Sequence, residues 1–273
     1  MVKPSAIILS GNGTNCETET AQACRLAGFE KIDIVTVWEL LNGDAVLDAY
    51  TLLILAGGFL DGDDLGSGQA QANRLLNSVS RRDNSPVIRQ FAGFIDDGKL
   101  ILGICNGFQL MIKLGLIPAV GKIYTVQQAT LTFNDSGKFE DRWVNLHVNA
   151  ESPCVFTKNI DTVYLPVRHG EGKFIARDTE LLDTIKAKGQ VVLSYVEPGN
   201  TTPTLEYPHN PNGSQSGIAG VCDPTGRIFG LMPHPEAYLH KTNHPRWTRE
   251  NLPEEGAGVA IFRNAFEHIK TVL

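Results

Sequence analysis

Short runs of apolar residues recur in the first part of the chain and alternate with segments of helical spacing. Four of these runs have the length of strands: residues 6–10, 32–37, 52–56 and 100–104. After the first run, residues 17–27 repeat their apolar positions at helical intervals and stop at Gly28, a residue that often follows a helix. Continuous apolar strands separated by helices are typical of a parallel sheet covered on both faces.

The pattern changes after residue 125. Residues 125–148, 162–170 and 190–196 contain strand-like segments with turn residues between them, which predicts antiparallel additions to the sheet. A C-terminal helix is predicted from apolar residues that share one face: Val259, Phe262, Phe266, Ile269 and Leu273. The pattern therefore predicts an α/β fold in a single domain over residues 1–273, with a mostly parallel central sheet, helices on both faces and antiparallel strands added to it.

Two long segments show neither strand nor helix periodicity. Residues 198–216 contain four prolines and almost no aliphatic side chains, and residues 239–256 are equally irregular. Because loops of this length are uncommon in compact domains without a function, we expect a role for them, with contact to a partner protein as the hypothesis.

Composition excludes several classes of protein. The 273 residues carry a net charge of −6, and the longest basic run is Arg81 and Arg82, so a nucleic-acid-binding surface has little support. The first apolar run is too short for a membrane span or a signal peptide. Five widely spaced cysteines without a C-x-x-C pair argue against a disulfide framework and a zinc site, and they fit a cytoplasmic protein.

One cysteine differs from the others in its neighbours. Gly103 and Gly107 flank Cys105 two residues away on either side, between a predicted strand and a helix predicted over residues 106–114. This is the spacing of the nucleophile elbow of hydrolases, with sulfur in place of oxygen. The amides at the start of the helix would favour the thiolate form. A buried structural cysteine between two closely packed glycines is the alternative, and the spacing alone does not decide between them.

A thiolate nucleophile needs a proton carrier and a group that orients it. Pro235 favours an extended His234, which would place Glu236 on the same side of the chain. The apolar run at 227–232 is predicted to be a strand that delivers this pair to a sheet edge. Standing alone, the motif would better suit a surface histidine in a proline-rich turn; the cysteine elbow in the same chain reverses this preference.

Two backbone N–H groups facing the developing negative charge would complete such a site. Asn106, directly after the cysteine, offers one, and Gly58, in the glycine pair after the third predicted strand, offers the other. Glycine pairs after strands are usually only turns, so the second assignment is weak without Cys105.

Three other motifs do not support a functional site. His240 and His244 have the spacing of metal ligands on a helix, but Pro245 follows and no third ligand is evident, so we expect no metal. Residues 93–100 imitate the start of a phosphate-binding loop, but they precede a strand instead of following one. Residues 11–16 are better explained as a turn in which Thr14 or Asn15 caps the next helix.

In order along the chain, the glycine pair, the cysteine and the His-x-Glu motif resemble the class I, or triad, glutamine amidotransferases, whose fold is flavodoxin-like. Over nearly its whole length the chain is more similar to one branch, the glutaminase subunits of phosphoribosylformylglycinamidine synthase. The matching segments are "GTNCETETAQACRLAG", "AGGFLDGDD", "GICNGFQLM", "NDSGKFEDRWV", "HGEGKF" and "EYPHNPNGSQSGIAGVCDPTGRIFGLMPHPE", of which the last is the most specific. The branch commonly reads GGFSYGD where this chain reads GGFLDGD, so the surface of that loop is expected to differ.

The resemblance implies roles for the matching residues. Cys105 would attack the side-chain amide of L-glutamine to form a γ-glutamyl thioester and release ammonia, with His234 carrying protons and Glu236 orienting it. Gly58 and Asn106 would hold the oxyanion. Residues expected to bind the substrate or support its pocket are Gln109, Asn134, Ser136, Phe139, His169 and Glu171; for these a purely structural role is the alternative, in the core for Phe139.

The resemblance also implies partners. No cofactor is expected in this chain; ATP and Mg²⁺ would bind to a larger synthetase subunit. That subunit would use the ammonia to convert formylglycinamide ribonucleotide to formylglycinamidine ribonucleotide in purine biosynthesis, with a further small subunit in the complex. Two alternatives remain: a stand-alone cysteine amidase or peptidase of the same superfamily, and a non-catalytic regulatory homologue.

Overall fold

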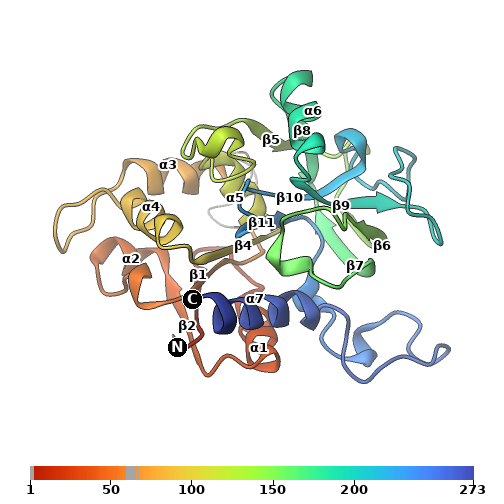
Figure 1. The fold of residues 1–273 in the computed structure, drawn as a ribbon, viewed down its shortest axis with the longest axis horizontal. Helices are drawn as coiled ribbons and strands as arrows, with labels where there is room; N and C mark the ends of the chain where they lie inside the picture. The colour runs from red at the N-terminus through yellow and green to blue at the C-terminus, as the bar shows by residue number, and fades with distance from the viewer. Residues whose placement is uncertain (1–2, 60–65, 67) are drawn as a thin grey trace.

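A nine-stranded mixed sheet organises the chain (Figure 1). The computed structural model describes residues 3–59, 66 and 68–273. Within them the strands of this sheet lie in the order β2-β1-β3-β4-β11-β10-β9-β6-β7. Their bounds are β1 Ser5–Ser10, β2 Lys31–Thr36, β3 Leu52–Leu55, β4 Leu100–Ile104, β6 Glu140–Val148, β7 Thr162–His169, β9 Val191–Val196, β10 Ile218–Cys222 and β11 Ile228–Leu231. Two further strands, β5 Ala129–Thr132 and β8 Lys173–Ala176, form a separate antiparallel pair.

Two halves of the sheet with different strand directions meet at β11. Strands β2, β1, β3, β4 and β11 are joined by parallel pairings. From β11 onward, β10, β9, β6 and β7 are joined by antiparallel pairings. Every residue of β1, β3 and β4 is buried, as expected for parallel strands covered on both faces. The α/β fold with antiparallel additions predicted from the sequence is confirmed.

Helices cover both faces of the parallel half. Figure 1 shows α1 and α7 side by side on one face and α3, α4 and α5 on the other, and the contacts among these helices agree. The helix bounds are α1 Glu17–Ala27, α2 Val37–Asn42, α3 Gln69–Asn77, α4 Ile88–Asp96, α5 Asn106–Lys113, α6 Thr179–Ala187 and α7 Val259–Val272. In the part of the chain that the structure describes, no helix has both the length and the apolar character needed to cross a membrane.

Strand β2 departs from the expectation of a strand covered on both faces. It is the outermost strand of the sheet, and only Val35 among its residues is buried. Val37, expected at the end of the strand, is the first residue of α2. An edge strand needs apolar side chains on only part of its surface, and the apolar run at 32–37 does not reveal which strand lies at the edge.

The start of α1 also differs from expectation. Cys16, and not Thr14 or Asn15, is the residue that precedes the helix as its N-cap, and no side chain caps the helix end. The Thr14 hydroxyl instead accepts a hydrogen bond from the Gly11 N–H over 3.1 Å. The capping prediction is therefore wrong, and Cys16 stands at the N-terminal end of a helix that follows β1.

The turn from β4 into α5 depends on two glycines. A Cβ on Gly107 would fall on the Leu55 carbonyl oxygen at the end of β3, and a Cβ on Gly103 would meet the Met111 sulfur and the Gly107 carbonyl. Helix α5 thus lies directly against the backbone of the sheet. The glycines that flank Cys105 are required by close packing, as the spacing of the elbow predicts.

Replacing Gly107 with alanine should destabilise the fold by about 3 kcal/mol, the upper end of the usual cost of overpacking, because a backbone carbonyl blocks the added methyl group. Urea unfolding followed by circular dichroism measures this change. Gly93→Ala is the matched control: Gly93 lies within α4 and its Cβ would have no heavy atom within 4 Å, so the same change should stabilise the chain by up to about 1 kcal/mol. Similar unfolding free energies for the two variants would contradict the proposed close packing of α5.

Candidate active site

Cys105 occupies the tight turn between β4 and α5 in a strained conformation. Its φ of 51° and ψ of −104° lie in a region that non-glycine residues rarely adopt, at a cost of about 1–3 kcal/mol. The Cys105 N–H donates to the Leu231 carbonyl over 2.8 Å, and the helix begins with the bond from Gln109 N–H to the Cys105 carbonyl. These bonds hold the sulfur at the carboxyl edge of the parallel strands.

The same edge receives His234. Strands β4 and β11 are parallel neighbours with Ile104 opposite Leu231, so the chain leaves both strands at the same level. Three residues after β11, the His234 N–H donates to the Pro166 carbonyl of β7 over 2.8 Å. Residues 105 and 234, far apart in sequence, are therefore brought together by strand pairing, and both line one cavity, where Cys105 raises the pKa of the His234 ring.

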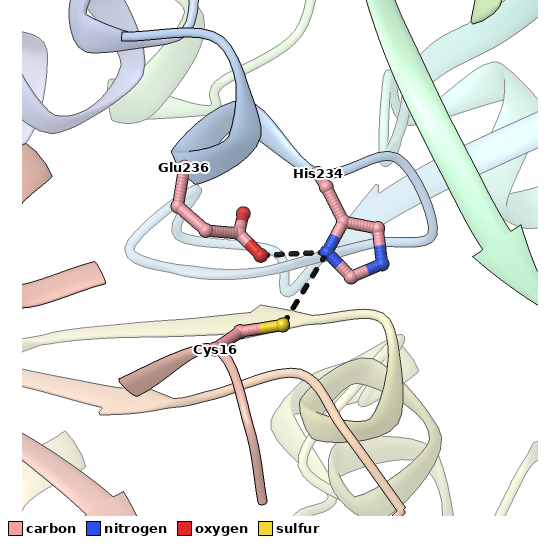
Figure 2. Close-up of side chains that lie close together, drawn as sticks. All are labelled: Cys16, His234 and Glu236. Atoms are coloured by element: carbon pink, nitrogen blue, oxygen red, sulfur yellow. Dashed lines mark hydrogen bonds and ion pairs between the residues drawn. The ribbon is translucent and has the colours of Figure 1, made fainter. Parts of the chain in front are cut away.

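Glu236 holds His234 through a short hydrogen bond. The ring Nδ1 lies 2.6 Å from the Glu236 Oε1, and both side chains are buried, with each residue 2% exposed (Figure 2). His234 itself is extended, as predicted, but Pro235–Ala237 forms one turn of 3₁₀ helix. The expectation that Glu236 reaches His234 along an extended chain is therefore wrong, and the turn brings the carboxylate to the ring instead.

The charges around His234 determine its protonation. Burial alone would lower the pKa of the imidazole, but the Glu236 carboxylate and the Cys105 sulfur outweigh this effect and raise the pKa well above its ordinary value. At neutral pH the ring is therefore in its charged imidazolium form, with the Nδ1–H donated to Glu236. The Cys105 sulfur also lies 3.5 Å from the Arg168 carbonyl of β7.

A cavity of about 340 Å³ opens beside these groups, a size typical of small-molecule sites. Five of the residues singled out in the sequence line it: Gly58, Cys105, Phe139, His234 and Glu236. The sequence analysis missed the remaining lining residues: Asn15, Cys16, Glu19, Phe59, Arg168 and Ala237. Two signals pointed to the first three: they lie in the matching segment GTNCETETAQACRLAG, and they follow β1, because parallel strands end at a shared edge.

Phe139 lies at the rim of this cavity and not in the core. Its side chain is 52% exposed, and its ring centroid is 6.2 Å from that of Phe59. The alternative of a core role for Phe139 is therefore wrong.

Gly58 is placed to offer its amide to the cavity. It pairs with Thr14 in an antiparallel bridge flanked by the bonds Asn15 N–H to Gly57 carbonyl (3.4 Å) and Phe59 N–H to Gly13 carbonyl (2.8 Å). In such a pair the two opposed residues do not bond to each other, so the bridge does not use the Gly58 N–H. Its φ is +136°, and a Cβ would lie 2.8 Å from the Asn15 nitrogen, so only glycine fits. Residues 60 and 61, where the chain departs from GGFSYGD, lie outside the described residues.

Four of the expected substrate or supporting residues, Gln109, Asn134, His169 and Glu171, are buried and are not among the residues that line the cavity. The Asn106 side chain donates to Gln109 Oε1 over 2.9 Å, and Gln109 Nε2 donates to the Glu171 carbonyl over 2.6 Å. Asn134 Oδ1 lies 3.1 Å from His169 Nδ1, while its amide donates to the His169 carbonyl. Asn106 itself is the first residue of α5, so its N–H lies at the N-terminal end of that helix.

His169 is held neutral within this network. Burial, with a smaller contribution from the charge on His234, lowers its pKa to about 3. Ser136 lies apart from it: it lines a separate surface hollow with Leu205 and Tyr207. The structure therefore brings His169, Asn134, Gln109 and Glu171 together as a support for the site, but it does not place Ser136 in the cavity beside Cys105.

Comparison with known proteins matches the whole chain to one family. The family model described as "CobB/CobQ-like glutamine amidotransferase domain" matches residues 3–269. The chain is 42% identical to the phosphoribosylformylglycinamidine synthase subunit PurQ of Dehalococcoides mccartyi, over 100% of both chains. It is 40% identical to the PurQ subunit of Methanococcus maripaludis, over 98% of both. Among solved structures, one described as PurLQS from Thermotoga maritima matches with a TM-score of 0.69 and 30% identity, covering 98% of this chain and 100% of that one.

Replacing Glu236 with glutamine should lower the pKa of His234, because burial would then act without the carboxylate that opposes it. An NMR titration of the imidazole measures the change. Glu19→Gln is the control, since Glu19 lines the same cavity but is exposed and makes no bond to His234. If the His234 titration were the same in the wild-type and Glu236→Gln proteins, the carboxylate would not be the group that keeps the ring charged.

Proposed function

The chain belongs to the family of CobB/CobQ-like glutamine amidotransferase domains, and we propose from this premise how its residues serve a phosphoribosylformylglycinamidine synthase. This chain is the glutaminase subunit of that enzyme: it hydrolyses L-glutamine and supplies ammonia for the formation of a C–N bond in purine biosynthesis. The observation that carries this function is the convergence of Cys105, on a strained elbow, with a His234 that Glu236 keeps protonated beside a small cavity.

In the first half of the reaction, the Cys105 thiolate attacks the side-chain carbonyl carbon of glutamine. The carbonyl oxygen becomes an oxyanion, which the N–H groups of Gly58 and Asn106 stabilise. As the tetrahedral intermediate collapses, the C–N bond breaks and the leaving amine takes a proton from His234. Because Nδ1 is committed to Glu236, this proton comes from Nε2. The products are ammonia and a γ-glutamyl thioester on Cys105.

In the second half, the neutral His234 accepts a proton from water at Nε2, and the resulting hydroxide attacks the thioester carbonyl. The same two amides stabilise the second oxyanion. Collapse breaks the C–S bond and restores the Cys105 thiolate, while His234 keeps the proton that it took from water. The new carboxylic acid loses its proton to solvent, and glutamate leaves.

The surrounding residues serve this reaction in two ways. Phe139, half exposed at the cavity rim, contacts the bound glutamine. Gln109, Glu171, Asn134 and His169 act through the backbone, because their hydrogen bonds join the start of α5 to the end of β7, where the Arg168 carbonyl faces the Cys105 sulfur. We propose that Ser136 belongs instead to a surface that binds the synthetase subunit.

A surface near the site is suited to the synthetase subunit. Leu205 and Tyr207 belong to the long segment of residues 198–216. They are 67% and 60% exposed and line a hollow with Ser136. The far end of the same loop is not free surface: Asn212 and Ser214 are buried, and Ser214 Oγ accepts from the Phe174 N–H of β8 over 3.0 Å. The loop thus holds two exposed apolar side chains on a rigid base, which supports its role in binding a partner.

We expect the remaining parts of the synthase outside this chain. ATP and Mg²⁺ belong to the large subunit, which binds formylglycinamide ribonucleotide and receives the ammonia, and a further small subunit completes the complex. No cofactor is expected in this chain, and the complex is expected to be cytoplasmic.

The decisive experiment is reconstitution of Cys105→Ser with the large and small subunits. This variant should lose glutamine-dependent synthesis of formylglycinamidine ribonucleotide and keep ammonia-dependent synthesis, because only ammonia release requires the thiolate. The product is measured with glutamine and then with an ammonium salt. Cys24→Ser, a change of another buried cysteine in α1, is the control and should keep both activities.

Two outcomes would contradict the proposal. Loss of both activities would mean that residue 105 serves the assembly of the complex and not glutamine hydrolysis. Unchanged glutamine-dependent synthesis would favour a non-catalytic homologue. A stand-alone amidase would be recognised by a different result: it would hydrolyse other amides vigorously in the absence of the synthetase subunits.

A further inference from the structure

A second thiol, that of Cys16, lies in the cavity beside the catalytic histidine. Its sulfur is 4.0 Å from His234 Nδ1 (Figure 2). It donates a hydrogen bond to the Asn15 side-chain oxygen over 3.2 Å. It lies at the N-terminal end of α1, where backbone amides favour a negative charge. The mechanism above gives Cys16 no role.

The group opposite Cys16 has unused bonding capacity. Only 2% of the Glu236 surface is exposed, and among the described residues its Oε2 has no hydrogen-bond partner. A buried carboxylate oxygen without a partner is unusual, since the large majority of buried polar atoms are bonded. A cation near this oxygen would satisfy it.

We propose that Cys16, His234 and Glu236 form a site for a single thiophilic divalent cation such as Zn²⁺. One ligand atom from each residue lies within 4.8 Å of the other two, so small side-chain movements would bring all three to zinc. Sulfur, imidazole nitrogen and carboxylate oxygen are the three ligand types that zinc uses, and three protein ligands leave a fourth position for water. This site departs from the expectation of no metal, because its ligands come from segments 218 residues apart.

Coordination requires the loss of two protons. In the metal-free protein Cys16 is a neutral thiol, because burial raises its pKa against the effect of the hydrogen bond with His234. His234 is protonated. Binding of Zn²⁺ therefore releases one proton from the Cys16 sulfur and one from His234 Nδ1 to solvent. The Cys16 thiolate and the Glu236 carboxylate then balance the two positive charges of the ion.

The consequence for activity rests on the proposed function. A cation on Nδ1 takes the place of the proton that Glu236 holds there, so the ring no longer alternates between its charged and neutral forms. Glutamine hydrolysis would stop while the Cys105 thiol remains unmodified. The site would thus act as a reversible inhibitory site, separate from any reaction of metal ions with the nucleophile.

Direct titration of the full-length chain with Zn²⁺, in competition with a chromophoric chelator, tests the site. Cys16→Ala should weaken binding by at least roughly 100-fold, since loss of even an outer-shell partner costs about 10- to 100-fold. Cys105→Ala should still bind one equivalent of Zn²⁺, because it keeps all three ligands. Cys24→Ala, two helical turns beyond Cys16 on α1, is the matched control for loss of a buried thiol and should also bind normally.

Co²⁺ gives an independent readout, because a cobalt–thiolate bond absorbs in the near ultraviolet. The band should persist in Cys105→Ala and disappear when Cys16→Ser is added, a change that keeps the side chain close in size. Loss of binding in Cys105→Ala with retention in Cys16→Ala would place the ion on the nucleophile and overturn the proposal. Failure of the wild type to bind one equivalent would overturn it as well. Both readouts are independent of glutaminase activity.

Discussion

The short bond between Glu236 and His234 is the constraint on which the site depends. A buried imidazole would normally be neutral, and a neutral ring could not hand a proton to the leaving amine. The carboxylate reverses this preference at a distance of 2.6 Å, in a place where neither group is exposed to screening water. The position of Cys105, the cavity and the strained elbow become useful only because the ring beside them stays charged.

The two halves of the sheet supply the groups that surround this pair. The parallel half contributes Cys105, the proposed nucleophile, and the Gly58 amide, each just beyond the carboxyl end of a strand. The antiparallel half contributes backbone carbonyls of β7: that of Pro166 anchors the His234 amide, and that of Arg168 faces the Cys105 sulfur. The reacting groups therefore lie where two differently built halves of one sheet meet, and the network of Asn134, His169 and Glu171 joins the halves behind the cavity.

How far the sequence predicts this arrangement depends on how local each feature is. The elbow could be predicted, because the close approach at Gly103 and Gly107 leaves a trace in adjacent residues. The pairing of His234 with Glu236 was predicted through the wrong local geometry, since a proline allows a 3₁₀ turn as readily as an extended chain. Cys16 and Arg168 could not be recognised as cavity residues, because their position depends on which strand ends lie next to each other. The edge position of β2 is hidden for the same reason.

The central place of β11 has a consequence for the growing polypeptide. This strand is the last of the sheet to be synthesised, yet among the described residues it is the strand between β4 and β10 that pairs with both halves of the sheet. A nascent chain that has not yet emerged from the ribosome past residue 231 holds two unfinished sheets with exposed edges, and it carries Cys105 without His234. Hydrolytic capability would thus arise in one late step of translation, and until then the open edges would need protection from pairing with other chains.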